Sequence, residues 1–206
     1  MTKILMFKTI TLIFIISLIY SLSFSQSNFS VKVTTFTCFP AENKNLHLFK
    51  NNLDASGHFA FEPGVVLSYE AFFMEDQVSI KFCEGFFYDV TGNPAGFSHL
   101  GIRIRILQQF KHSLNVGFGP TLHFRKDRST IQGYVSENIY NEGMGFQWIL
   151  SKLSGGIEYN YLHTKKGDYT VSLFHNHHEG FALFFGYRYW FSKEIKHWKC
   201  ATCPAF

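Results

Sequence analysis

Long segments in which apolar and polar residues alternate strictly constrain this chain more than any other feature. Between Leu114 and Phe124 every second residue is apolar, and the residues between them are Asn, Gly, Thr or His. Successive side chains of a β-strand point to opposite faces, so this period of two predicts a strand. The same pattern recurs at 58–73, 99–106 and 181–191, and in weaker form at 29–38, 77–90, 147–162 and 168–176. The sequence therefore predicts eight strands.

The two faces of these strands differ in a way that indicates a membrane. One face is aliphatic and aromatic, in a chain with 25 Phe and 10 Tyr, whereas the other carries Lys and Arg together with Gly and Ser. Strands of about 10 to 16 residues exceed the usual length in soluble sheets and suit a tilted crossing of a bilayer. We therefore expect an all-β fold, an eight-stranded antiparallel up-and-down transmembrane β-barrel with a polar lumen. Because the period does not say which face is outside, a soluble periplasmic barrel that binds an apolar ligand is the alternative.

The first 25 residues have the pattern of a signal peptide. Lys3 and Lys8 give a basic start, 10–20 is a short apolar run, and Ser23 and Ser25 form a small-x-small cleavage site before Gln26. A single anchoring helix is the alternative for this segment. We expect three parts: a signal peptide at 1–25, a barrel at 26–191 and a periplasmic tail at 192–206.

The lengths of the expected connections agree with such a barrel, which has short periplasmic turns and longer outer loops. Short turns are expected near 75–76, 110–111 and 164–167, and the outer loops are expected at 39–57, 92–95, 126–146 and 176–179. One residue conflicts with the pattern, because Glu84 falls on the apolar face of 77–90. A β-bulge or a different register there would remove the conflict.

The last strand carries a terminal pattern of the form hydrophobic-x-Gly-x-x-aromatic-x-aromatic, made by Phe184, Gly186, Tyr189 and Phe191. With this pattern the chain resembles the small integral outer-membrane β-barrel proteins of Gram-negative bacteria. The resemblance covers about residues 28–191. It implies a location in the cell outer membrane, contact with outer-membrane lipid and recognition of these four residues by the barrel-assembly machinery. In that class the pattern normally ends the chain, whereas here fifteen residues follow it.

Eight strands enclose an interior just wide enough for side chains, so a conducting pore is not expected. Charged side chains of both signs fall on the polar face, and buried charges must pair. We expect them to form a network of ion pairs that serves as the core. The expected inward charges are Glu62, Glu70, Lys81, Asp89, Arg103, Arg105, Arg125, Lys152, Glu158 and Arg188.

Two groups of residues are candidates for chemistry. The expected register brings Glu62, Asp89, His99 and His123 to a similar height near the outer mouth, with Ser98 close by. Carboxylates beside imidazoles could orient a general base or hold a metal, and a hydrogen-bonded rim is the alternative. Three histidines, His175, His177 and His178, fall in the last expected outer loop. They could bind one metal ion together, or they could simply be exposed to solvent.

The tail contains Cys200 and Cys203 as a Cys-x-x-Cys pair after a basic stretch. This pair could form a disulfide, provide two metal ligands or act as a redox or docking tag for a periplasmic protein partner. Cys38 and Cys83 fall on non-adjacent strands, so no bond between them is expected.

The sequence favours a structural or interaction role, as a membrane anchor that presents its outer loops, and membership of an envelope complex is one form that this role could take. The alternative is a lipid A-modifying enzyme, an acyl hydrolase or acyltransferase, which rests on analogy of fold alone. The sequence does not decide whether the protein is an enzyme. No cofactor is expected, and the scattered net charge of +4 does not indicate binding of nucleic acid.

Overall fold

The computed structural model describes residues 26–39, 44–45, 48–74, 77–135, 139–176 and 180–191. The predicted signal peptide at 1–25 and the tail at 192–206, with Cys200 and Cys203, lie outside these ranges. Within them the strands are β1 (Ser27–Cys38), β2 (Phe59–Met74), β3 (Val78–Tyr88), β4 (Pro94–Gln109), β5 (His112–Lys126), β6 (Asn141–Gly143), β7 (Phe146–Thr164), β8 (Gly167–Asn176) and β9 (Gly180–Trp190). All except the short β6 correspond to the eight predicted segments.

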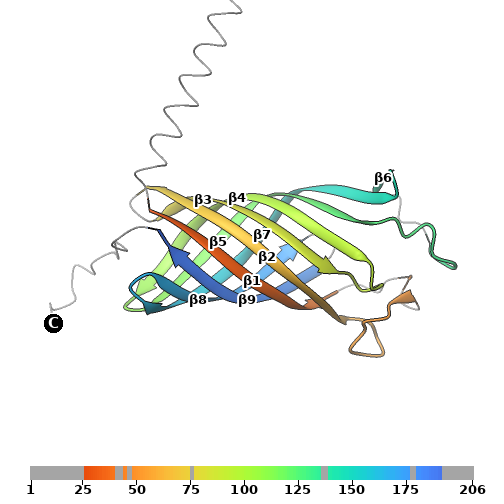
Figure 1. Ribbon diagram of the computed structural model, residues 1–206, viewed down its shortest axis with the longest axis horizontal. Coiled ribbons are helices and arrows are strands. Elements are labelled where there is room, and N and C mark those ends of the chain that lie inside the picture. The colour runs from red at the N-terminus through yellow and green to blue at the C-terminus, as the bar shows by residue number, and fades with distance from the viewer. Residues whose placement is uncertain are drawn as a thin grey trace, which may run out of the picture.

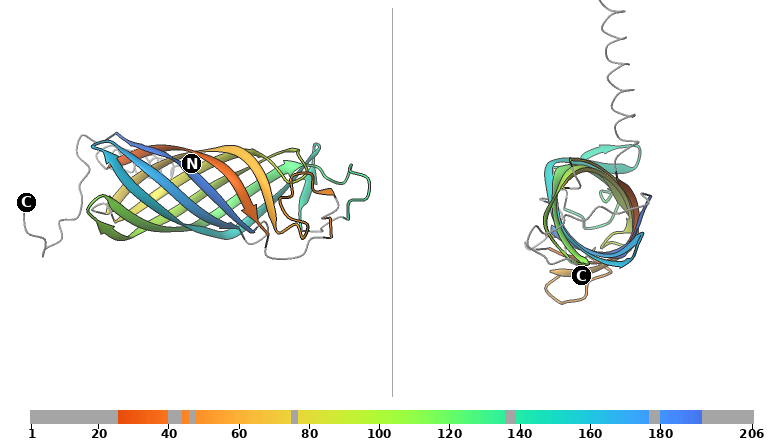
Figure 2. Two further views of the ribbon diagram at one scale, coloured as in Figure 1. Left: turned by 90° about the horizontal axis from the view of Figure 1, so that it is seen from below. Right: turned by 90° about the vertical axis from the view of Figure 1, so that its left-hand side faces the viewer.

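The eight long strands close into a barrel. Neighbouring strands are antiparallel, β1 pairs with both β2 and β9, and β5 pairs with β7 across the segment that contains β6 (Figure 2). A row of paired residues that starts at Ser27, the first residue of β1, returns after one circuit to Cys38, the last residue of that strand. This stagger tilts the strands, as closure of a barrel requires. The predicted up-and-down topology is confirmed.

The polarity of the barrel is inverted relative to that of a soluble protein. Outward side chains such as Phe82 and Ile102 are 48% and 45% exposed, whereas the inward Glu70 and Arg188 are 0% and 2% exposed. An apolar exterior around a polar interior is the arrangement of a transmembrane β-barrel. The prediction that the aliphatic and aromatic face is the outer one is confirmed. No helix within the described ranges is long and apolar enough to cross a membrane.

The two ends of the barrel differ. The short connections 110–111 and 165–166 lie at one end, together with the end of β2, the start of β1 and the end of β9 (Figure 1). The described parts of the longer segments 39–58 and 127–145 lie at the other end, as predicted. We call these the short-turn end and the long-loop end.

The loops at the long-loop end are tied to one another. The Asn45 side chain donates a hydrogen bond to Val135 O at 3.0 Å and accepts one from Val135 N at 2.7 Å. The amides of Lys50 and Asn51 donate to Val90 O at 2.9 and 3.3 Å. The first loop is thus joined both to the β3–β4 connection and to the loop that follows β5.

A bulge opposite Pro120 changes the face on which one predicted residue lies. Gly119 pairs with Ser154 and Thr121 pairs with Ser151, so two residues of β7 stand opposite Pro120. Proline has no amide hydrogen to donate to the sheet, and bulges form at such positions. Lys152 was expected to face the lumen, and this is wrong: the bulge leaves it exposed on the outer face.

Glu84 lies on the outer face without any irregularity around it. The β2–β3 and β3–β4 registers both run unbroken through Glu84, which pairs with Leu67 and Ser98. The expectation that a bulge or a different register removes the conflict is wrong. Instead, the Ser98 hydroxyl donates a hydrogen bond to the Glu84 carboxylate at 2.9 Å.

Candidate functional site

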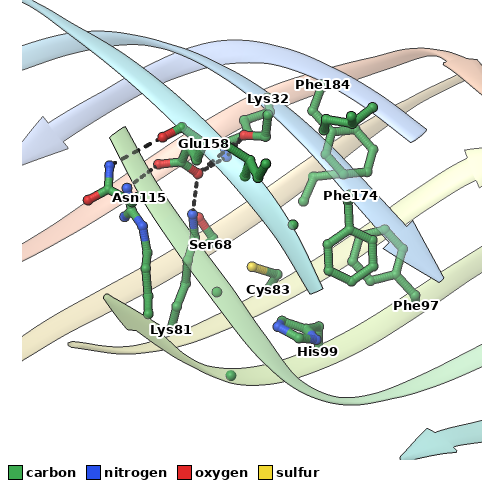
Figure 3. A pocket seen from close by; sticks show the side chains of 18 of the residues that line it. Lys32, Ser68, Lys81, Cys83, Phe97, His99, Asn115, Glu158, Phe174 and Phe184 are labelled. Carbon is green, nitrogen blue, oxygen red and sulfur yellow. Dashed lines mark hydrogen bonds and ion pairs between the residues drawn. The ribbon is translucent and has the colours of Figure 1, made fainter. Parts of the chain in front are cut away.

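Glu158 is the centre of a group of buried charges in the lumen (Figure 3). Its Oε2 pairs with Lys32 Nζ and, at 2.6 Å, with Lys81 Nζ, and its Oε1 lies 2.6 Å from Arg103 Nη2. Ser172 Oγ donates a further hydrogen bond at 3.2 Å. The three cations come from β1, β3 and β4, whereas Glu158 is on β7. One carboxylate therefore joins strands across the barrel.

A second carboxylate, Glu70, extends this group toward the short-turn end. Glu70 accepts hydrogen bonds from Arg103, from Ser79 and, at 2.9 Å, from Asn28 Nδ2. Arg188 Nη1 lies 3.6 Å from the carboxylates of both Glu70 and Glu158. Through Arg103 and Arg188 these carboxylates form one connected network.

Asp168 completes the network at the start of β8. Its Oδ2 accepts hydrogen bonds from the Arg188 guanidinium and, at 2.9 Å, from Trp190 Nε1. We call this network the charge cluster. Its members are Lys32, Glu70, Lys81, Arg103, Glu158, Asp168 and Arg188.

Local sequence makes room for these long side chains. Gly186 of β9 pairs with Lys32 of β1, and a Cβ at Gly186 would collide with the Lys32 side chain and with Val31 O. Because ionised groups removed from water are costly unless they are paired, the two signs must be placed together. The cluster meets this condition with four cations and three carboxylates.

A layer of aromatic rings lies on the long-loop side of the charge cluster. The ring of Phe97 stacks on Phe174 at a centroid distance of 5.8 Å and on Phe184 at 6.1 Å, while Phe174 and Phe184 are 6.4 Å apart. Figure 3 shows these three rings together, beside the charged side chains. We call Phe97, Phe174 and Phe184 the aromatic layer.

The aromatic layer separates two small cavities. The larger, of about 70 Å³, is also lined by Lys81, Cys83 and Glu158. The smaller, of about 30 Å³, is lined by Glu62, His123 and Thr37 on the long-loop side. All three rings of the aromatic layer line both cavities, so these rings lie between them. Spaces of this size suit a few water molecules.

Above the smaller cavity, side chains from loops and strands close the mouth. Arg128 donates to Asp89 Oδ2 from Nη2 at 2.6 Å and from Nε at 3.1 Å. Arg125 donates to Gln147 Oε1 at 3.1 Å, and its guanidinium lies 3.6 Å from the centre of the Tyr140 ring. These contacts fix the loop after β5 over the lumen.

The structure brings only part of the expected acid–base group together, because Glu62 and His123 line the smaller cavity. Glu62 accepts hydrogen bonds from Thr37 Oγ1 and, at 3.0 Å, from Val90 N, so it does lie beside Asp89. Asp89 N donates to Asn93 O, which makes a tight turn, and Phe97 pairs with Gly85 rather than lying near Asp89. The expectation that Asp89 and His99 lie at a similar height is therefore wrong, because His99 pairs with Cys83, well before Asp89 in the chain.

Both expected imidazoles lie beside the aromatic layer, and His99 lies deeper in the lumen than these carboxylates. His99 Nδ1 shares a hydrogen bond of 2.7 Å with Thr121 Oγ1, and its ring meets Phe174 edge-on at 5.1 Å. The His123 ring lies 5.8 Å from that of Phe97. Ser98 points outward toward Glu84. The two histidines contact aromatic rings, and Ser98 belongs to the outer surface.

The other sequence candidates have separate positions. Arg105 lies near the short-turn end, with its guanidinium 5.1 Å from the Phe72 ring, whereas Arg125 is at the mouth. His175 stacks on Phe181 at 4.5 Å, and His177 and His178 lie outside the described residues. Within the described ranges, no three His, Cys, Asp or Glu side chains are grouped as metal ligands. Cys38 and Cys83 are free thiols.

Two members of the charge cluster were not among the expected inward charges. Lys32 follows Val31 and precedes Val33, and Asp168 precedes Tyr169 in the same alternating pattern. The alternation of polar and apolar residues therefore predicts that both side chains point into the lumen. Because the carboxylates of the cluster are held by buried cations, the arrangement suits a structural core better than proton transfer.

A closed barrel with an apolar exterior and a lumen filled by ion pairs and aromatic rings defines the class of this protein: it is a small transmembrane β-barrel. No protein-family model matches the chain, and no curated protein matches it.

Three outer-membrane barrels of known structure are similar to the chain. The N-terminal β-barrel domain of Pseudomonas aeruginosa OprF has 12% identity and a TM-score of 0.49, over 81% of this chain and 99% of that one. OprG from Pseudomonas aeruginosa has 10% identity and a TM-score of 0.46, over 81% and 96%. Ail, the attachment invasion locus protein of Yersinia pestis, has 12% identity and a TM-score of 0.44, over 81% and 97%. At these values the likeness is one of fold and says nothing about function.

Proposed function

We propose that this protein is a sealed barrel of the bacterial outer membrane that anchors a loop surface there and has a structural or interaction role. The observation that carries this proposal is the filling of the lumen. The charge cluster occupies the half near the short-turn end, and the aromatic layer separates it from the mouth. Moving an ion past such a network would require breaking buried ion pairs, which is costly.

The short-turn end is also filled. The Phe72 ring stacks on the Trp190 ring at 5.5 Å, and both are buried. The Arg188 guanidinium lies 4.7 Å from the centre of the Trp190 ring. Packing at this end therefore supports a barrel that holds its shape rather than one that transports a solute.

The long-loop end has the properties of an interaction surface. Its loops are joined by the paired hydrogen bonds of Asn45 and Val135, so they present one continuous structure. They also expose apolar side chains to water, with Leu53 at 56%, Ile139 at 49% and Met144 fully exposed. A contiguous apolar patch built from such side chains would be a site for binding another macromolecule.

Two measurements test this proposal. Membrane fractionation, combined with a gel that compares heated and unheated protein, should place the chain in the outer membrane as a heat-modifiable species. Reconstitution into planar lipid bilayers should give no steady conductance. Recovery in a soluble fraction, or stable channels from the unaltered protein, would contradict the proposal.

A third measurement separates the proposed role from the lipid A-modifying alternative. Expression of the protein should leave the mass spectrum of lipid A unchanged. A defined loss or gain of an acyl chain would instead identify an enzyme.

A further inference from the structure

The charge cluster contains four cations and three carboxylates, so one of its positive charges is not balanced. The imbalance is greatest at the larger of the two cavities in the lumen. Three of the cations line this cavity together with only one of the carboxylates: Lys32, Lys81 and Arg103 with Glu158. A buried charge without a counter-charge is costly, so a further source of negative charge is expected at this cavity.

Hydrogen-bond donors at the larger cavity also outnumber their partners. Within the described part of the chain, Lys81 Nζ donates to a single acceptor, Glu158 Oε2 at 2.6 Å, although an ammonium group has three N–H donors. Lys32 Nζ donates to the same oxygen and, at 2.6 Å, to Ser172 Oγ. Arg103 Nε is buried and has no hydrogen-bond partner among the described residues. Two donors of Lys81, one of Lys32 and one of Arg103 therefore remain for a ligand.

The shape of the cavity limits what this ligand can be. The space lies between the ammonium groups of Lys32 and Lys81 and the rings of the aromatic layer (Figure 3). Its volume of about 70 Å³ exceeds what one water molecule needs, but it leaves no room for an organic acid beside the side chains that fill the lumen. A monatomic ion, alone or with a water molecule, fits this space.

Charge distinguishes an anion from water as the occupant. A water molecule would accept hydrogen bonds from the unused N–H groups, but it would leave the positive charge unbalanced. An anion does both. The protein has one other group at this cavity that could become negative, the thiol of Cys83, and the experiment below separates a Cys83 thiolate from a bound ion.

We propose that the larger cavity binds one monovalent inorganic anion of the size of chloride. The ammonium groups of Lys32 and Lys81 hold it, and the neighbouring Arg103 adds a third positive charge. The bound anion brings the charge cluster to equal numbers of each sign and uses N–H donors that Glu158 leaves free. This site goes beyond the proposed function, because it concerns how the lumen is stabilised and not what the loops bind.

Chloride itself is the probe for the first test. Urea unfolding is followed in phosphatidylcholine vesicles while gluconate, which is too large for the cavity, is replaced stepwise by chloride at constant ionic strength, so that screening does not change. An ion that binds only the folded chain raises the folding equilibrium constant about tenfold for each tenfold rise in its concentration above the dissociation constant. Bromide should have the same effect. A folding equilibrium that does not respond to chloride would overturn the inference.

Variants locate the effect. Lys81→Met removes two unused donors and the excess cation, and it should abolish the response to chloride. Lys111→Met removes a lysine charge from the exposed turn after β4 and should keep the full response. Cys83→Ser should also keep it. A response that is absent from the unaltered protein and appears only in Cys83→Ser would show that the thiolate supplies the charge, and an unchanged response in Lys81→Met would place the ion elsewhere. Either result overturns the inference.

A crystal of the unaltered protein refolded in bromide gives a readout that does not depend on any variant. An anomalous difference peak is expected in the larger cavity, within hydrogen-bonding reach of Lys81 Nζ. Bromide found only on the protein surface would contradict the site. Heat-modifiable migration shows that each sample is a folded membrane barrel, so failure of this inference is distinguishable from failure of the proposed function.

Discussion

Lys32 of β1 and Glu158 of β7, which are 126 residues apart in the sequence, form an ion pair inside the barrel. The same Glu158 carboxylate also binds Lys81 and Arg103, which come from two further strands. Where a soluble sheet would have an apolar core, this barrel has charges that connect strands across the lumen. Its stability should therefore depend on the pairing of charges inside it.

Replacing Glu158 with Gln should destabilise the barrel by about 3–5 kcal/mol, because it leaves buried cations without their central carboxylate. Urea unfolding in lipid vesicles, followed by tryptophan fluorescence, measures this change. Glu142→Gln is the matched control, since Glu142 is exposed on β6 and an amide oxygen can still accept its hydrogen bond from Gln147. The control should change stability by less than about 0.5 kcal/mol. Equal effects of the two variants would contradict the central role of Glu158.

Lys81→Met should cost less than Glu158→Gln in the same unfolding measurement. The charge cluster has four cations and three carboxylates, so the loss of Lys81 leaves equal numbers of each sign. Lys81 also lines the larger cavity and is the most exposed cation of the cluster, with 11% of its side chain accessible. If Lys81→Met is as damaging as Glu158→Gln, the balance of charge does not govern the stability of the lumen.

Shortening two rings of the aromatic layer should join the two cavities. The double variant Phe174→Ala and Phe184→Ala should lose several kcal/mol of stability, since a large-to-small change of one buried Phe costs about 3–5 kcal/mol. Where it folds, as its migration on unheated gels shows, it should still give no steady conductance in planar bilayers, because the charge cluster and the Phe72–Trp190 stack continue to fill the half near the short-turn end. Phe185→Ala is the control, because Phe185 lies on the outer face of the same strand. Equal losses of stability in the control and the double variant would contradict the packing role of these rings, and steady conductance from the double variant would show that the charge cluster does not seal the lumen.

The architecture could be predicted from the sequence because side chains alternate between the two faces of a strand. In a closed barrel one of these faces lines the lumen and the other is the exterior. Glu70, Arg103 and Glu158 were placed in the lumen by this reasoning, and the structure shows them buried there. The tight connection near 75–76 also fixed the register well enough to bring Glu62 beside Asp89.

Contacts that depend on a single extra residue could not be predicted in the same way. Pro120 creates a bulge that moves Lys152 from one face to the other, although the pattern around it continues. The turn at Asp89 is closed by hydrogen bonds from Thr91 and Asn93 to its own carboxylate, which shifts the next strand relative to the expected pairing. His99 was consequently placed too close to the mouth. A one-residue error in register changes every pairing beyond it.

The loop after β5 should loosen when its link to the barrel is removed. Arg128 donates two hydrogen bonds to Asp89, and both residues are buried. Arg128→Ala should therefore increase cleavage by chymotrypsin at Tyr134, while the barrel strands stay resistant. Arg128→Lys keeps a charge that can pair with Asp89 and should be cleaved at an intermediate rate. Unchanged cleavage of Arg128→Ala would show that other contacts hold this loop.

The first loop should respond to acid through Asp54. Asp54 accepts hydrogen bonds from Phe59 N at 2.8 Å and from His58 N at 3.2 Å, and these amides lower the pKa of Asp54 below its ordinary value of 3.8. A lowered folded-state pKa means that the stabilising contribution is complete above the ordinary pKa and is lost as pH falls through the folded value. The amide resonances of His58 and Phe59 should therefore shift together and reversibly, with a midpoint below 3.8. Asp54→Asn should abolish this titration, and a midpoint above the ordinary value would contradict the contact.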